Sequence, residues 1–219
     1  MINIVNGGSF IMAQRLKDES RQAIINSAKE EFLEKGYKNA SMRNIAKKAN
    51  MTVGNLYRYF PSKEDINRLI VGDTLNEINE IIRNITSDSV SMETRVFNIK
   101  ADVNELSDVM NQLADRLVDV YQKHKIEFNI LMMNSGVNKE LIEWFSRAIN
   151  SLIDQHFPIE GFSNEKTILS RSYAISIFAG MREIFRRTTI EQDHLKILVK
   201  TYLNSYIVML DSDIRKLVK

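Results

Sequence analysis

Apolar side chains recur at spacings of three and four residues over long stretches of this chain, which is the period of an α-helix. No segment shows the sustained two-residue alternation that is typical of a half-buried strand. Only 8 glycines and 2 prolines interrupt the 219 residues, which disfavours a fold rich in tight turns. The sequence therefore predicts an all-α protein. The clearest apolar stripe consists of Ile99, Val103, Leu106, Met110, Leu113 and Leu117.

The absence of cysteine excludes several kinds of site. Without cysteine there is no disulfide, no thiolate zinc site and no cysteine nucleophile. The three histidines lie far apart without the spacing of metal ligands, so we expect neither a metal nor a cofactor. No phosphate-binding loop, nucleophile elbow or zinc-protease motif occurs, so we expect no enzyme. No apolar run approaches the ~18 residues of a membrane span, and we expect a cytoplasmic protein without membrane contact.

Charge is distributed unevenly along the chain. Residues 1–63 contain 11 lysines and arginines against 5 acidic residues, whereas the remainder contains 19 against 23. A basic N-terminal segment followed by a slightly acidic body predicts a polyanion-binding head on a separate scaffold.

Three short helices are predicted between residues 18 and 60. Gly36 follows the first of them, where a residue with positive φ is expected. Ser41 and Thr52 stand where they can cap the second and third helices. Asn50 lies at the tight turn between these two, and asparagine tolerates positive φ better than other non-glycine residues. This arrangement is a helix-turn-helix.

The segment Ile24–Lys63 resembles the N-terminal DNA-binding domain of the TetR family of bacterial transcriptional regulators. Asn50 departs from the family pattern, which usually has glycine there, and Val53 stands where polar residues are common. The resemblance implies an all-α protein in which a helix-turn-helix domain precedes a helical ligand-binding and dimerisation domain. The matching positions are Ala28, Phe32, Gly36, Tyr37, Ile45, Ala46, Gly54, Leu56, Tyr57, Tyr59, Phe60, Ser62, Lys63 and Glu64.

The second helix of a helix-turn-helix lies in the major groove, and its first residues meet base edges. Asn55 can pair with adenine or contact a phosphate, and Arg43 can reach a guanine or a phosphate. Val53 either loses a base contact or reads a thymine methyl group. The resemblance implies phosphate contacts at Tyr57, Tyr59 and Lys63. The predicted DNA-binding residues are Ser41, Arg43, Thr52, Val53, Gly54, Asn55, Tyr57, Arg58, Tyr59 and Lys63.

We divide the chain into a flexible tail (1–17), a DNA-binding domain (18–63) and an effector-binding and dimerisation domain (64–219). Met12 is an alternative start. The body is predicted to be helical over 62–85, 92–123, 126–134, 139–156, 163–187 and 191–216. The last two of these helices carry apolar residues on two sides, which predicts a homodimer through them. Ser172, Ser176, Ala179 and Gly180 permit close helix approach.

The resemblance also implies a ligand cavity in the body, and methionine and aromatic side chains suit a small apolar effector. The alternative for each candidate is a plain core residue. The candidates are Met110, Tyr121, His124, Phe128, Met132, Met133, Trp144 and Phe178.

Two functions follow from this sequence. The first is a dimeric regulator of transcription, most often a repressor in this family, that binds a pseudo-palindromic operator on double-stranded DNA and is released by an effector. The second is a TetR-like DNA-binding scaffold whose C-terminal domain binds a protein partner. A sealed apolar cavity favours the first, and a large exposed apolar patch favours the second.

Overall fold

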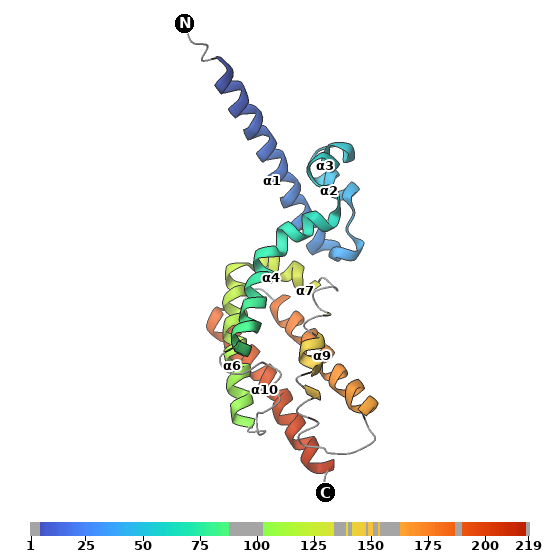
Figure 1. The fold of residues 1–219 in the computed structure, drawn as a ribbon, viewed down its shortest axis with the longest axis vertical. Coiled ribbons are helices and arrows are strands. Elements are labelled where there is room, and N and C mark those ends of the chain that lie inside the picture. Colours follow the sequence, from blue (N-terminus) through green and yellow to red (C-terminus); the bar gives the residue numbers. More distant parts are fainter. Residues whose placement is uncertain are drawn as a thin grey trace. The chain divides into compact units, whose positions relative to one another are not determined.

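The computed structural model describes residues 5–87, 103–133, 139, 142–147, 149–150, 153, 163–186 and 190–217. Within these ranges the regular elements are helices, as predicted (Figure 1). None of the described helices is both long and apolar enough to cross a bilayer. The chain divides into two compact units, Met1–Asp73 and Thr74–Lys219. The division lies inside a helix, ten residues beyond the boundary that we predicted.

The N-terminal unit contains α1 (Val5–Asn39), α2 (Met42–Lys48), α3 (Val53–Tyr59) and the first part of α4 (Lys63–Ser87). Helix α2 packs against both α1 and α3. Apolar side chains at helical spacing meet in a small core, as the sequence predicts. Its most buried members are Ile24, Ala28, Phe32, Ile45, Ala46, Leu56, Phe60 and Ile66.

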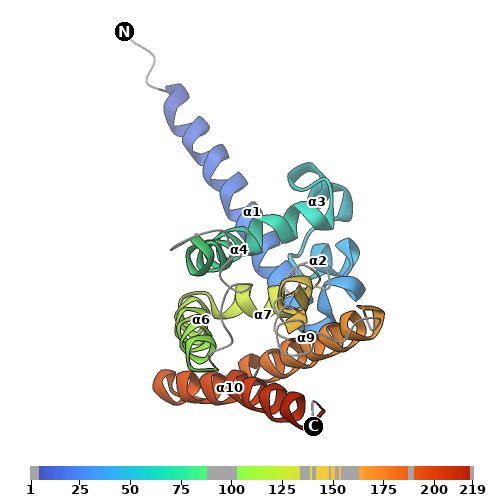
Figure 2. The same cartoon turned by 60° about the horizontal axis from the view of Figure 1, so that its bottom comes forward.

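The first helix begins earlier than the sequence indicates. We expected a tail up to residue 17 and a helix from about Asp18, but α1 already begins at Val5. The N-terminal part of α1 extends beyond α2 and α3 in both views (Figures 1 and 2). Ile11 and Met12 in this part are 69% and 68% exposed, so its apolar side chains lie outside the core and leave no helical pattern of burial to read.

Gly36 interrupts α1 near its C-terminal end, as predicted. Its backbone angles, φ 72° and ψ 155°, are not helical. Only glycine readily adopts this combination, because a Cβ atom would clash with the backbone. The chain therefore leaves the axis of α1 at Gly36 and turns toward α2.

The second unit contains the rest of α4, α6 (Val103–Lys123), α7 (Lys125–Met133), α9 (Ser163–Arg186) and α10 (Gln192–Leu217). These bounds agree with the predicted helices to within two residues, except that residues 92–102 lie outside the described residues. The predicted helix 139–156 is described in part, and 142–147 are helical.

Helix α10 packs against α6, and polar contacts follow one edge of the pair. The Lys196 ammonium lies 2.7 Å from the Asp119 carboxylate, and that of Lys200 lies 2.7 Å from Asp115. The Asn204 amide donates to Asn111 at 2.8 Å. Since residue numbers rise on α10 as they fall on α6, the two helices are antiparallel.

Candidate nucleic-acid interface

Hydrogen bonds from side chains fix the start of both short helices in the helix-turn-helix. The Ser41 hydroxyl accepts from the Asn44 backbone N–H at 3.2 Å, and the Thr52 hydroxyl accepts from that of Asn55 at 3.2 Å. Both residues have extended backbone angles, as N-cap residues do. Asn50 between the helices has φ 53°. The predicted caps and the predicted turn residue are therefore confirmed.

A buried carboxylate that sequence reasoning missed joins α2 to α1. Glu31 is 1% exposed, and its carboxylate accepts from the Asn44 amide at 2.9 Å. The Lys48 ammonium lies 3.4 Å from Glu31 and 2.8 Å from Glu34. Lys48 holds the pKa of Glu34 below its ordinary value by hydrogen bonding and charge. The spacing of Glu31 from Ala28 placed it on the inward face of the helix, which was the available signal.

Lys63 performs a structural task that the sequence does not predict. Its ammonium donates to the backbone carbonyl oxygens of Tyr37 at 2.8 Å and Ala40 at 2.9 Å, and reaches that of Lys38 at 3.4 Å. An ammonium has three N–H donors, so these carbonyls engage all of them. Lys63 thereby satisfies the end of α1, where carbonyl groups lack helical partners.

Tyr37 completes this corner of the unit. The Lys63 ammonium lies 4.6 Å from the centre of the Tyr37 ring. The Tyr37 hydroxyl donates to the Glu64 carboxylate at 2.7 Å. Burial, and secondly this hydrogen bond, raise the pKa of Tyr37 to about 12. The Tyr37 ring thus joins the end of α1 to the start of α4 through Lys63 and Glu64.

An open groove of about 830 Å³ lies where α2 meets the turn and α3. Three of the predicted DNA-binding residues, Arg43, Thr52 and Val53, line it. Neither Arg43 nor Lys47 forms an ion pair within the described part of the chain. Unpaired cations beside a groove favour a polyanionic occupant. The lining residues are Arg43, Asn44, Lys47, Asn50, Met51, Thr52 and Val53.

Five of the other predicted DNA-binding residues lie on α3, while Ser41 caps α2 and Lys63 begins α4. Gly54 is exposed, and a Cβ atom built there would have no neighbour within 4 Å. Tyr57 is 49% exposed and Arg58 is exposed, whereas Asn55 and Tyr59 are half-buried. A ligand can therefore reach Gly54, Tyr57 and Arg58 directly and Asn55 and Tyr59 in part. The contacts of these residues with DNA stay predictions.

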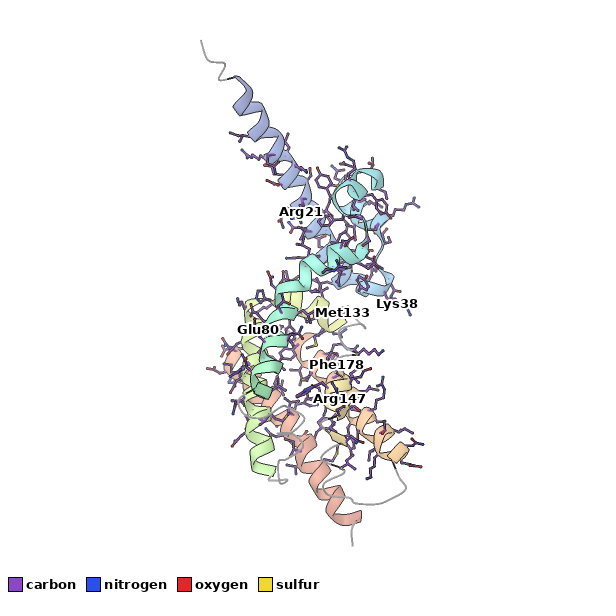
Figure 3. The ribbon with its side chains drawn as sticks, viewed as in Figure 1. Arg21, Lys38, Glu80, Met133, Arg147 and Phe178 are labelled. Carbon is purple, nitrogen blue, oxygen red and sulfur yellow. The ribbon has the colours of Figure 1, made fainter. Side chains whose placement is uncertain are left out.

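A cation–aromatic contact joins α1 to Phe60, the residue that follows the last turn of α3. The Arg21 guanidinium lies 5.3 Å from the centre of the Phe60 ring. Figure 3 shows Arg21 on the long part of α1, whereas Lys38 lies beyond the interruption at Gly36. Arg21 therefore stabilises the end of α3 through the face of Phe60.

The predicted effector residues in the body have different surroundings. Tyr121, Phe128 and Phe185 form an aromatic cluster with ring centres 4.8–5.6 Å apart. Met110, Met132 and Phe178 are also buried in the body, and Trp144 is half-buried with its ring against Phe145. Phe185, which closes the cluster, was not among our candidates.

Two further candidates lie outside the buried core. His124 is half-buried, and its Nε2 lies 3.0 Å from the Glu77 carboxylate of α4, which also binds Lys123 at 2.5 Å. Met133 ends α7 and is 37% exposed (Figure 3). The structure therefore brings Tyr121 and Phe128 together and places His124 at the junction of α4, α6 and α7.

Comparison with known proteins agrees with this geometry. Residues 24–68 match the family described as "Bacterial regulatory proteins, tetR family". The HTH-type transcriptional regulator SAB2452 of Staphylococcus aureus is 27% identical over 194 residues, which cover 85% of this chain and 89% of that protein. The uncharacterized HTH-type transcriptional regulator YfiR of Bacillus subtilis is 24% identical over 148 residues, covering 64% of this chain and 68% of YfiR.

Among solved structures, a TetR-like transcriptional regulator from Rhodococcus sp. RHA1 is similar with a TM-score of 0.49 and 14% identity, covering 84% of this chain and 92% of that one. The family match coincides with the capped helices and the turn described above. Residues 24–68 therefore carry the DNA-binding domain of the TetR family of bacterial regulatory proteins, and the chain is similar over most of its length to HTH-type transcriptional regulators.

Proposed function

We propose that this protein is a homodimeric repressor that binds a pseudo-palindromic operator and leaves it when a small apolar effector binds the body. The observation that carries the homodimer is the apolar face that α9 and α10 leave exposed, a feature that would equally favour the scaffold function. Ile168 and Ile175 on α9 are 66% and 47% exposed, and Ile197 and Val208 on α10 are 61% and 62% exposed. A second copy would cover these side chains.

The opposite face of α10 is buried in the core of this chain. On α10, Leu195, Val199, Leu203 and Ile207 are buried at successive spacings of four residues. Exposed apolar residues on the other side therefore have no place in the core of this chain. Patches of this kind on a helical body mark interaction sites. A two-fold pairing of the bodies would present two α3 helices to two half-sites, about 34–36 Å apart.

Small residues support close packing on this face of α9. Ser172, Ser176 and Ala179 are exposed at spacings of four and three residues. Side chains this small let a partner helix come near the backbone of α9. On the α10 side, the Tyr202 hydroxyl donates to the Ser176 carbonyl at 2.8 Å. The two helices are thus joined to each other, and we propose that they pair with the partner as one surface.

The proposal of an apolar effector is supported by the cluster around Tyr121. The Tyr121 side chain is 2% exposed, and its hydroxyl has only the Asn129 side chain beside it, without a hydrogen bond of ordinary geometry among the described residues. Leaving such a group unpaired costs about 1–3 kcal/mol. A ligand with a largely apolar body and one hydrogen-bonding group would pack on the rings and satisfy this hydroxyl. Binding of the effector and of DNA would then weaken each other by the same factor.

Transcription in vitro tests the regulatory role directly. A promoter that contains the selected operator is transcribed with and without the purified protein, and then with candidate apolar effectors. We expect the protein to reduce transcript and the effector to restore it, with two protomers bound per operator. An increase in transcript would contradict repression. A transcript level that no small molecule changes, together with a body that captures a protein partner, would favour the scaffold function.

A further inference from the structure

Two apolar side chains interrupt the polar lining of the groove between α2 and α3. Met51 and Val53 line it together with five polar or charged residues, and both are half-buried. They are not members of the core, which is filled by Ile45, Leu56 and Phe60 at 0–4% exposure. Water covers part of each side chain, so an occupant with apolar surface is favoured over a purely polar one.

Local hydrogen bonds fix the backbone at and beside these two residues before any ligand arrives. The Met51 backbone N–H donates to the Ala46 carbonyl at 3.0 Å. Val53 follows the capping residue Thr52, whose carbonyl accepts from the Leu56 N–H at 3.1 Å. Valine is also stiff at χ1, because both methyl groups branch from Cβ. A contact made by Val53 therefore loses little conformational entropy.

The major groove of DNA offers one apolar group for such a surface. Among the base edges exposed there, only thymine carries a methyl group, at C5, and the remaining groups are hydrogen-bond donors and acceptors. Arg43 and Lys47 line the same groove and supply positive charge for phosphates or guanine. The groove thus combines two cations with two apolar side chains. This combination suits a thymine methyl group close to the phosphates of the DNA backbone.

We infer that Val53, supported by Met51, reads the 5-methyl group of a thymine in each half-site. The inference rests on the proposed binding to a specific operator, and it names what one position of that operator contains. Burying one methyl group gains about 0.8 kcal/mol, which is about a fourfold change in affinity. Val53 would then be a specificity-determining residue, because it distinguishes thymine from a pyrimidine without the methyl group.

Replacing thymine by uracil tests this inference without changing any base pair. Deoxyuridine lacks only the methyl group, so each thymine of the selected operator half-site is replaced in turn and the dissociation constant is measured with the full-length protein. We expect one thymine per half-site at which the replacement weakens binding about fourfold. With Val53→Ala the same replacement should have no effect at that position.

Three further variants complete the experiment. Val53→Thr keeps the branched shape and is a second variant should Val53→Ala fold poorly; it should lower the uracil penalty. Met51→Ala should lower the penalty at the same thymine, because Met51 supplies the other apolar side chain of the groove. Leu69→Ala is the matched control, since Leu69 is 44% exposed on α4 and does not line the groove; it should leave the penalty unchanged.

The outcomes separate the inference from the proposed function. If the operator is bound specifically but no uracil replacement depends on Val53, the thymine reading is wrong and the regulatory function stands. If uracil penalties exist but persist in Val53→Ala and Val53→Thr, another residue reads the methyl group and the assignment to Val53 is wrong. If no sequence is preferred over any other, the proposed operator binding itself fails.

Discussion

The two short helices that carry most of the predicted DNA-binding residues and the last two helices expose different chemistry. Helices α2 and α3 have seven residues each, and their exposed side chains are mainly polar or charged, such as Arg43, Lys47 and Arg58. Helices α9 and α10 have 24 and 26 residues and expose several large apolar side chains among their polar ones, such as Ile168, Ile175, Ile197 and Val208. The first surface suits a polyanion, and the second suits an apolar partner. One chain thus carries a basic surface on α2 and α3 and a partly apolar surface on α9 and α10, and these two surfaces suit different partners.

The means of stabilisation differ as well. In the N-terminal unit, caps, the Glu31 cluster and Lys63 join neighbouring helices through side-chain hydrogen bonds to backbone and to buried groups. In the body, long helix faces pack, and charged pairs such as Lys196–Asp119 follow an exposed edge. Exposed pairs contribute little, typically below about 1 kcal/mol. We therefore expect the loss of a polar side chain to lower the free energy of unfolding more in the N-terminal unit, and the loss of an apolar side chain to lower it more in the second unit.

The largest expected effect is on the dimer. Ile175→Glu places one carboxylate from each protomer in an apolar interface, where an unpaired buried charge costs several kcal/mol. We expect the dimer dissociation constant, measured by sedimentation equilibrium, to rise at least about 100-fold, and operator affinity to fall with it. Ile11→Glu is the matched control, since Ile11 is 69% exposed in the other unit. An Ile175→Glu protein that stays fully dimeric would contradict the proposed interface.

The second-largest effect is expected for Lys63. Its substitution distinguishes a structural role at the end of α1 from a contact with a DNA phosphate. Because its ammonium is engaged by backbone carbonyls, Lys63→Met should lower the free energy of unfolding of the head by about 2–3 kcal/mol. The same substitution should leave the slope of log K against log salt unchanged at temperatures where the head is folded. Urea unfolding and binding titrations at several salt concentrations measure the two quantities.

Lys47→Met is the matched comparison for that experiment. Lys47 is exposed and lines the groove, so its loss should flatten the salt slope by about 0.9 and leave stability nearly unchanged. If Lys63→Met flattens the slope while stability is kept, Lys63 contacts a phosphate, as the family resemblance implied, and its structural role in the free protein is secondary.

Asn55 tests how the head reads sequence. Asn55→Ala should cost about 1–3 kcal/mol at a single base pair of the operator if the amide pairs with adenine. Dissociation constants for operators changed at one position at a time give the answer. An equal loss for every sequence would assign Asn55 to a phosphate instead.

The smallest effect concerns the junction of α4 with α6 and α7. Lys123 first, and His124 second, hold the pKa of Glu77 below its ordinary value of 4.5. A lowered folded-state pKa stabilises the protein above the unfolded-state pKa, and this contribution is lost as the pH falls through the folded-state value. Glu77→Gln should therefore lower the free energy of unfolding by less than about 1 kcal/mol at pH 7. The difference from the parent protein should shrink as the pH falls below 4.5 and vanish only below the lowered folded-state pKa, as thermal unfolding at several pH values would reveal; a constant difference would contradict the assignment.

The head was predictable where structure depends on neighbouring residues. Ser41 and Thr52 cap their helices and Asn50 adopts positive φ because each choice is made within three or four residues along the chain. Lys63 was not predictable, since its carbonyl partners lie 23–26 residues away. The extension of α1 to Val5 was not predicted, because its apolar side chains Ile11 and Met12 are exposed and leave no pattern of burial.

The body was predictable in its helices and less so in its site. Helical spacing located α6, α7, α9 and α10, because each long helix carries its own pattern. The aromatic cluster joins Tyr121, Phe128 and Phe185 from three helices. The pattern along one helix does not specify which side chains of another it meets. The approach of Tyr202 to Gly180 likewise depends on how α9 and α10 cross.

Selection of bound genomic fragments by the purified full-length protein, followed by sequencing, is the direct test of specific operator binding. We expect fragments that share a pseudo-palindrome near a few promoters, with half-site centres one helical turn, about 10–10.5 base pairs, or a multiple of it apart. Capture that is indifferent to sequence and falls steeply with salt would contradict it, because the head would then supply charge attraction alone.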